Sequence, residues 1–155
     1  MIFLALKIFI CMLNFFLYLS IIITSILLME FVAIFSHKYI MHGPGWIFHR
    51  SHHINKDKHK FELNDYYFLF FSSPSILCFV FGFIKWNPIL ISIGFGILCY
   101  GLIYILLHDL MVHKRFGFKL KFTNSYLAKV KKSHLKHHAC RNKDGATNFG
   151  FIIYK

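Results

Sequence analysis

Three long apolar runs constrain this chain more than any other feature of its sequence. They cover residues 2–35, 66–84 and 89–107. Each is close to or above the roughly 20 apolar residues that a helix needs to cross the hydrocarbon of a bilayer. Since backbone amides and carbonyls find no partners in lipid, runs of this length fold as helices. The sequence therefore predicts an all-α integral membrane protein with three transmembrane helices.

Polar segments separate these runs. Residues 36–65 follow the first run and contain Gly-Pro-Gly at 43–45, which interrupts a helix. The sequence Lys-Trp-Asn-Pro at 85–88 divides the second run from the third, so these two are expected to form a helical hairpin. We expect one membrane domain over residues 1–155, with a histidine-rich helical cap built from the two polar segments, 36–65 and 108–155. A four-span version, with two short helices in place of the first run, is the alternative.

The basic residues predict the orientation. The formal net charge is +12, and Lys and Arg concentrate in residues 36–65 and after His113, whereas the hairpin turn offers only Lys85. The positive-inside rule places both basic segments in the cytoplasm, and three spans with the amino terminus outside satisfy this rule. We expect the basic segments to contact anionic membrane lipid and no nucleic acid, because the apolar bulk lies in the bilayer. The expected location is the cytoplasmic membrane of a bacterium.

Ten of the 11 histidines fall in four boxes that repeat in order. In each polar segment an H-x4-H box precedes an H-x2-H-H box. The first repeat holds His37, His42, His49, His52 and His53, and the second holds His108, His113, His134, His137 and His138. Only His59 is left over, and we expect it to be a solvated loop residue.

Helical spacing makes these ten histidines candidate metal ligands. Positions i, i+3 and i+4 of an α-helix fall within about 100° of arc, so each H-x2-H-H triplet can project from one face as a metal claw. The members of an H-x4-H pair lie about 140° apart on an ideal helix. His37 and His42 therefore either serve different metals or require local unwinding, which the Gly-Pro-Gly sequence can supply. Two metals suit the pattern better than one.

The donor types narrow the metal. Imidazole suits iron, copper, zinc and nickel, and the sequence has no C-x-x-C pair for structural zinc or an iron-sulfur cluster. Aspartate and glutamate are too few for a carboxylate-bridged site within a helix bundle. A dinuclear non-haem iron centre is the leading candidate. Asp109 follows a box histidine directly, and we expect its carboxylate to hold the tautomer of an imidazole.

Further stretches flank the boxes. They are Glu30-Phe31 followed by residues 37–46, residues 61–65, residues 100–104 leading into His108-Asp109, and residues 148–151. Over most of the chain these stretches resemble the beta-carotene hydroxylase family, within the superfamily of membrane fatty acid hydroxylases and desaturases. The segment 114–118 is only loosely similar, and Asn148 stands where serine is expected.

The resemblance implies a beta-carotene 3-hydroxylase. Such an enzyme uses two ferrous ions, O2 and external electrons to hydroxylate the β-ionone ring of beta-carotene, giving cryptoxanthin and zeaxanthin. The sequence has no G-x-G-x-x-G fingerprint and no cysteine set for a cluster, so a separate donor must supply the electrons. A reduced ferredoxin that docks on the basic face is our hypothesis.

The histidine boxes are also compatible with other functions. The histidine spacing alone is shared by carotenoid ketolases and by lipid or sterol hydroxylases of the same superfamily, so only the flanking stretches favour the hydroxylation of a carotenoid. A membrane metal transporter is an alternative of a different class. Transporter sites, however, lie near the bilayer midplane on broken helices, whereas these boxes lie at the ends of spans.

Overall fold

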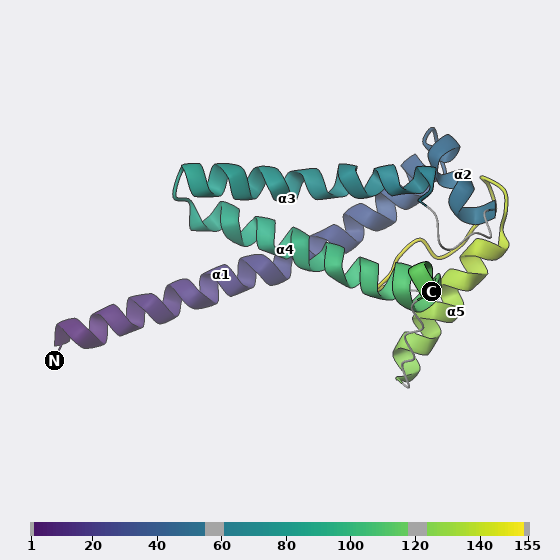
Figure 1. Ribbon diagram of the computed structural model, residues 1–155. Helices are drawn as coiled ribbons and strands as arrows, with labels where there is room; N and C mark the ends of the chain where they lie inside the picture. Colours follow the sequence, from purple (N-terminus) through teal and green to yellow (C-terminus); the bar gives the residue numbers. More distant parts are fainter. Residues whose placement is uncertain (1, 55–60, 118–123, 154–155) are drawn as a thin grey trace.

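The computed structural model describes residues 2–54, 61–117 and 124–153, and these residues form helices and connecting turns without a strand. The long helices are α1 (Ile2–Phe35), α3 (Tyr66–Ile84) and α4 (Pro88–Tyr104). Two short helices, α2 (Trp46–Ile54) and α5 (Ser125–Ala139), lie together at one end of the long ones (Figure 1). The expected all-helical architecture is confirmed.

Three helices are long and apolar enough to cross a membrane. With their continuations they cover Ile2–Met41, Leu63–Ile84 and Pro88–Val112, which confirms the prediction of three spans. The four-span alternative is wrong, because α1 is one continuous helix. Its sequence contains neither proline nor glycine, so no residue in this helix favours a break.

Small and polar residues form the contacts between the spans. The buried positions of the three long helices are Ser25, Glu30, Ser75, Gly82, Ser92, Gly94, Gly96 and Tyr100. Large apolar side chains point outward instead; Phe70, for example, is 63% exposed. This distribution is typical of helices that pack through small residues and present their large residues to lipid.

Helix α4 packs against both α1 and α3, and two glycines allow this close approach. A Cβ on Gly96 would lie 2.5 Å from Cβ of Ser25, and a Cβ on Gly94 would lie 3.2 Å from the carbonyl oxygen of Ser75. The hydroxyl of Ser75 in turn donates a hydrogen bond of 2.8 Å to the Gly94 carbonyl. These contacts fix α4 between its neighbours.

The ends of the long helices position the site. The turn between α3 and α4 lies at the far end of the bundle from α2 and α5 (Figure 1). There Asn87 caps α4 by accepting hydrogen bonds from the amides of Ile89 and Leu90, at 3.0 and 3.2 Å. All four histidine boxes are therefore brought to the opposite end of the bundle from this turn.

Candidate metal centre

The ten box histidines gather in two groups of five. In each group, one ring nitrogen from every histidine lies within 4.8 Å of the ring nitrogens of the others. We call the set His37, His42, His49, His53 and His137 the first group, and the set His52, His108, His113, His134 and His138 the second group. His59 lies outside the described residues.

Both H-x4-H boxes lie on π-helical turns, Ser36–Met41 and Ile105–Val112. The amide of His42 donates to the carbonyl of His37 at 2.9 Å, and the amide of His113 donates to that of His108 at 3.0 Å. This i to i+5 hydrogen bonding widens the turn and brings residues five apart onto one face. Each pair therefore joins a single group, and of the two expectations for His37 and His42 the structure shows the local unwinding. The local unwinding takes the form of a π-helix.

The H-x2-H-H triplets divide between the two groups. Helix α2 gives His49 and His53 to the first group and His52 to the second, and α5 gives His134 and His138 to the second and His137 to the first. The expectation that each triplet forms one claw is therefore wrong. Residues i and i+4 differ by only about 40° around a helix, whereas i+3 lies on the other side of i. Each short helix thus lies between the groups and serves both.

The imidazoles of the first group donate to neutral acceptors. Nδ1 of His49 donates to Oδ1 of Asn64 at 2.6 Å. The other four Nδ1 atoms donate to the carbonyl oxygens of Cys140, Lys143, Thr147 and Phe149, at 2.8 to 3.0 Å. An acceptor at Nδ1 keeps the ring proton there and leaves the lone pair on Nε2.

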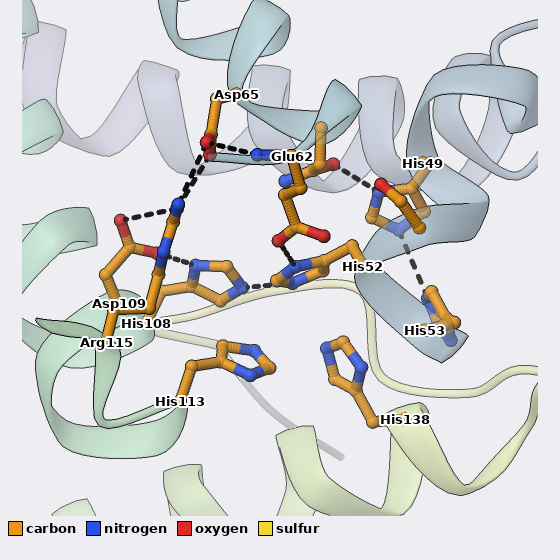
Figure 2. A network of polar contacts seen from close by, with 12 residues as sticks. His49, His52, His53, Glu62, Asp65, His108, Asp109, His113, Arg115 and His138 are labelled. Carbon is orange, nitrogen blue, oxygen red and sulfur yellow. Dashed lines mark hydrogen bonds and ion pairs between the residues drawn. The ribbon is translucent and has the colours of Figure 1, made fainter. Parts of the chain in front are cut away.

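Two imidazoles of the second group donate to carboxylates instead (Figure 2). Nδ1 of His52 donates to Oε1 of Glu62 at 2.8 Å, and Nδ1 of His108 donates to Oδ1 of Asp109 at 2.6 Å. The guanidinium of Arg115 binds both carboxylate oxygens of Asp65, at 2.6 and 2.9 Å, and lies 3.7 Å from Oδ2 of Asp109. A connected set of acidic and basic side chains therefore lies behind this group.

The Nε2 atoms converge at distances that fit a bound cation. Pairs of Nε2 atoms within each group lie 2.8 to 3.2 Å apart, for example 3.0 Å between His37 and His49 and 2.8 Å between His52 and His108. Since these four rings carry their proton on Nδ1, lone pairs would face each other and repel without a cation between them. Two neighbouring ligands at about 2.1 Å from a metal lie about 3 Å apart. The donor set fits two metal ions.

Burial keeps the rings in the form that binds metal. It lowers the pKa of His49 from its ordinary 6.5 to about 3, against the opposing effect of the hydrogen bond with Asn64. It also lowers the pKa of His137 to about 3 and that of His53 to about 4, although backbone carbonyls oppose the shift in both. A neutral imidazole offers a lone pair to a metal, so these shifts favour ligation near neutral pH.

Residues 140–153, which we call the C-terminal strap, supply the four carbonyls of the first group. Its end is held by Glu30 of α1, which is 1% exposed. Oε1 of Glu30 accepts hydrogen bonds of 2.8 to 2.9 Å from the amides of residues 151–153, and Oε2 accepts one of 2.8 Å from the Tyr100 hydroxyl. A carboxylate within a span thus fixes the strap over the histidines.

Sequence reasoning assigned no role to several of these residues. Glu30, Glu62 and Asn64 lie in stretches that drew attention only through family resemblance, and Arg115 lies in the loosely similar segment. Their spacing in the sequence did not predict these contacts, because their hydrogen-bond partners belong to other elements. Asp109 was singled out, and its carboxylate does contact the neighbouring imidazole.

Comparisons with known proteins agree with this geometry. The family model described as fatty acid hydroxylase matches residues 22–154. The chain is 41% identical over 133 residues to a beta-carotene hydroxylase of a Paracoccus species, covering 85% of this chain and 81% of that protein. It is 42% identical over 132 residues to a beta-carotene hydroxylase of Pantoea ananas, covering 85% and 74%.

A chloroplastic beta-carotene 3-hydroxylase of an Oncidium hybrid cultivar is 34% identical over 128 residues, which cover 81% of this chain and 41% of the plant protein. No solved structure gives a significant match. The extent of the family match and the identity to the bacterial relatives lead to one conclusion. The chain is an integral membrane protein that belongs to the fatty acid hydroxylase family, together with the beta-carotene hydroxylases.

Proposed function

We propose that this protein is a beta-carotene 3-hydroxylase, which uses O2 to convert beta-carotene into cryptoxanthin and zeaxanthin. The observation that carries this proposal is the identity of 41 to 42% with bacterial beta-carotene hydroxylases over 85% of the chain. The three apolar spans support it, because a long polyene partitions into the bilayer around them. A ring at the end of such a polyene can then approach the two histidine groups at the end of the bundle.

We propose further that the ten box histidines hold two iron ions. Bound iron supplies the activation of O2 that no side chain provides. The protein's own residues prepare the site for it. The acceptors at Nδ1 orient the imidazoles and leave Nε2 free, and burial keeps the rings neutral. The large apolar surface of the spans keeps the substrate in the membrane.

The proposed electron donor is a reduced ferredoxin on the cytoplasmic side of a bacterial membrane. Its docking surface on this chain includes Lys129, Lys132 and Lys136, which are exposed on α5 next to the histidines of that helix. Acidic partners are attracted to such a surface, and salt weakens the attraction. Turnover that responds neither to salt nor to replacement of these lysines would contradict this docking site.

Pigment analysis tests the reaction. Bacterial cells that accumulate beta-carotene are made to express the chain, and their pigments are separated by mass-resolved chromatography. We expect zeaxanthin or cryptoxanthin from the wild type and unchanged beta-carotene from the double variant His52→Ala, His137→Ala, which removes one histidine from each group. Leu135→Ala is the matched control, because this side chain is exposed on the same helix.

Other products would redirect the assignment. A ketocarotenoid from the wild type would identify a ketolase. Unchanged beta-carotene from folded, iron-loaded protein would contradict action on carotenoids and favour a lipid substrate.

A further inference from the structure

The two histidine groups differ in the charge of the atoms behind their imidazoles. In the first group, all five Nδ1 atoms donate to neutral oxygens, four from the C-terminal strap and one from Asn64. In the second group, His52 and His108 donate to the carboxylates of Glu62 and Asp109. The groups resemble each other in ligands and differ in their electrostatic surroundings.

The contrast is sharpest at one turn of the chain. Glu62 and Asn64 are two residues apart, and they hold His52 and His49, which are neighbours on α2. The Glu62 side chain is 11% exposed and Asn64 is 7% exposed, so water screens neither contact strongly. One turn therefore places a carboxylate behind one group and an amide behind the other.

The single described cation of this region does not cancel the difference. Arg115 forms a paired hydrogen bond with Asp65 and lies farther, at 3.7 Å, from Asp109 (Figure 2). Three carboxylates, those of Glu62, Asp65 and Asp109, therefore surround one guanidinium among the described residues behind the second group. The strap accepts the Nδ1 protons of the first group through carbonyl oxygens alone. Its one carboxylate near this group, that of Asp144, is exposed and acts on His42 without a hydrogen bond among the described residues, so water screens its charge.

A carboxylate that accepts the Nδ1 proton of a metal ligand makes the imidazole a stronger electron donor. It also favours the more positive state of the metal by direct attraction. When a ferrous ion gives one electron to an external oxidant and becomes ferric, its charge rises from +2 to +3. The ion nearer to the buried carboxylates therefore loses its electron more readily.

We propose that Glu62 and Asp109 are positioning residues that make the iron of the second group the more easily oxidised of the two. The neutral acceptors of the first group hold its iron in the ferrous state at higher potentials. This inference rests on the proposed function, because it requires that both groups hold iron. It assigns the two groups different electron-transfer roles although each has five imidazoles.

The test is an anaerobic redox titration of the full-length protein loaded with iron-57. Ferricyanide and dithionite set the potential, and Mössbauer spectra report the ferric fraction. We expect two separate one-electron steps in the wild type. Glu62→Gln keeps the shape and the acceptor oxygen but removes the charge. It should lower the ferric-to-ferrous ratio of the second group about tenfold at a given potential, which means that the lower midpoint rises by about 59 mV. The upper midpoint should stay in place.

A complementary variant keeps the test decisive if Glu62→Gln fails to hold two irons. Asn64→Asp places a charge behind His49 and should lower the upper midpoint, so that the two steps approach each other. Lys85→Gln is the control, because it changes the net charge by the same amount at the hairpin turn and should move neither midpoint.

Coincident midpoints in the wild type would overturn the inference. So would an iron-loaded Glu62→Gln or Asn64→Asp protein whose midpoints are those of the wild type. Both results would count against this inference alone, because the proposed function is tested separately by the pigments that the wild type makes. A wild type that binds fewer than two irons or makes no zeaxanthin would instead contradict the proposed function on which the inference rests.

Discussion

At the scale of single residues, Glu30 is unusual because it is a carboxylate buried inside a helix that crosses lipid. A charged group at such a position is unfavourable unless it is fully hydrogen-bonded, and those that persist generally serve function. Glu30 accepts three backbone amides and one hydroxyl, so both of its oxygens are satisfied. Its partners belong to α4 and to the C-terminal strap, which means that one side chain connects three distant parts of the sequence.

Replacement of Glu30 by Gln tests this connection. A glutamine has one acceptor oxygen in place of two, and its amide group faces donors, so the strap should detach from α1. Because strap carbonyls orient four imidazoles of the first group, we expect metal affinity to fall by about 10- to 100-fold. Iron retained during dialysis against a chelator measures the loss. Ser20→Ala, an exposed position on the same helix, is the control. Equal retention in Glu30→Gln and the wild type would contradict the role given to Glu30.

The residues of the site could be predicted from the sequence only in part. The ten histidines were recognisable because their spacing repeats, and Asp109 because it adjoins one of them. Glu30 and Arg115 gave no such signal, since they act on residues 121 and 50 positions away, respectively. The acceptors in the strap are backbone carbonyls, which any residue type provides. Their role follows from the path of the chain and not from its side chains.

At the scale of elements, the structure departs from predictions based on ideal α-helix geometry in two places. That geometry placed the H-x4-H residues on different faces, because it did not foresee that both boxes are wound as π-helices. It also treated each triplet as one claw, because it considered α2 and α5 in isolation. A helix that packs between two groups directs some of its histidines to one group and the rest to the other. Which histidine joins which group depends on the tertiary structure and not on spacing alone.

Double variants test the division of the triplets. His53 and His137 belong to one group, so we expect His53→Ala, His137→Ala to lose one metal and keep the other. His53 and His138 belong to different groups, so His53→Ala, His138→Ala should lose both. Elemental analysis of the purified proteins gives the metal per chain. The same metal content in both double variants would contradict the grouping, since the two variants differ only by one position on α5.

At the scale of the whole molecule, the spans were the most predictable part. Length and continuous apolarity alone place α1 and α3 over the expected ranges, and the third span begins one residue earlier and continues farther, as a π-helix, than its apolar run. The packing between the spans was not predictable, because it depends on which serines and glycines face each other. The orientation in the membrane remains a prediction from the distribution of basic residues.

The stability of the whole protein should depend on pH in acid. The pKa values of His49, His53 and His137 fall from 6.5 to between about 3 and about 4 on folding. Between pH 6.5 and these values the unfolded chain therefore binds more protons than the folded chain. The free energy of unfolding then decreases as the pH falls through this window. Thermal unfolding of the metal-free protein in detergent should show a falling midpoint from pH 6.5 to 4. A midpoint constant over this range would contradict the burial of the rings.

Each of the two short helices contributes histidines to both groups, and this division has a consequence for biosynthesis. The first group requires His137 and the second requires His138, so both remain incomplete until α5 has been made. A ribosome that has released the chain only as far as His113 offers four histidines of the first group and three of the second. Under the proposed ligation, insertion into the membrane precedes the completion of either metal site. Both sites are then completed within two residues of chain elongation, which makes delivery of the two ions a single late event in the maturation of the protein.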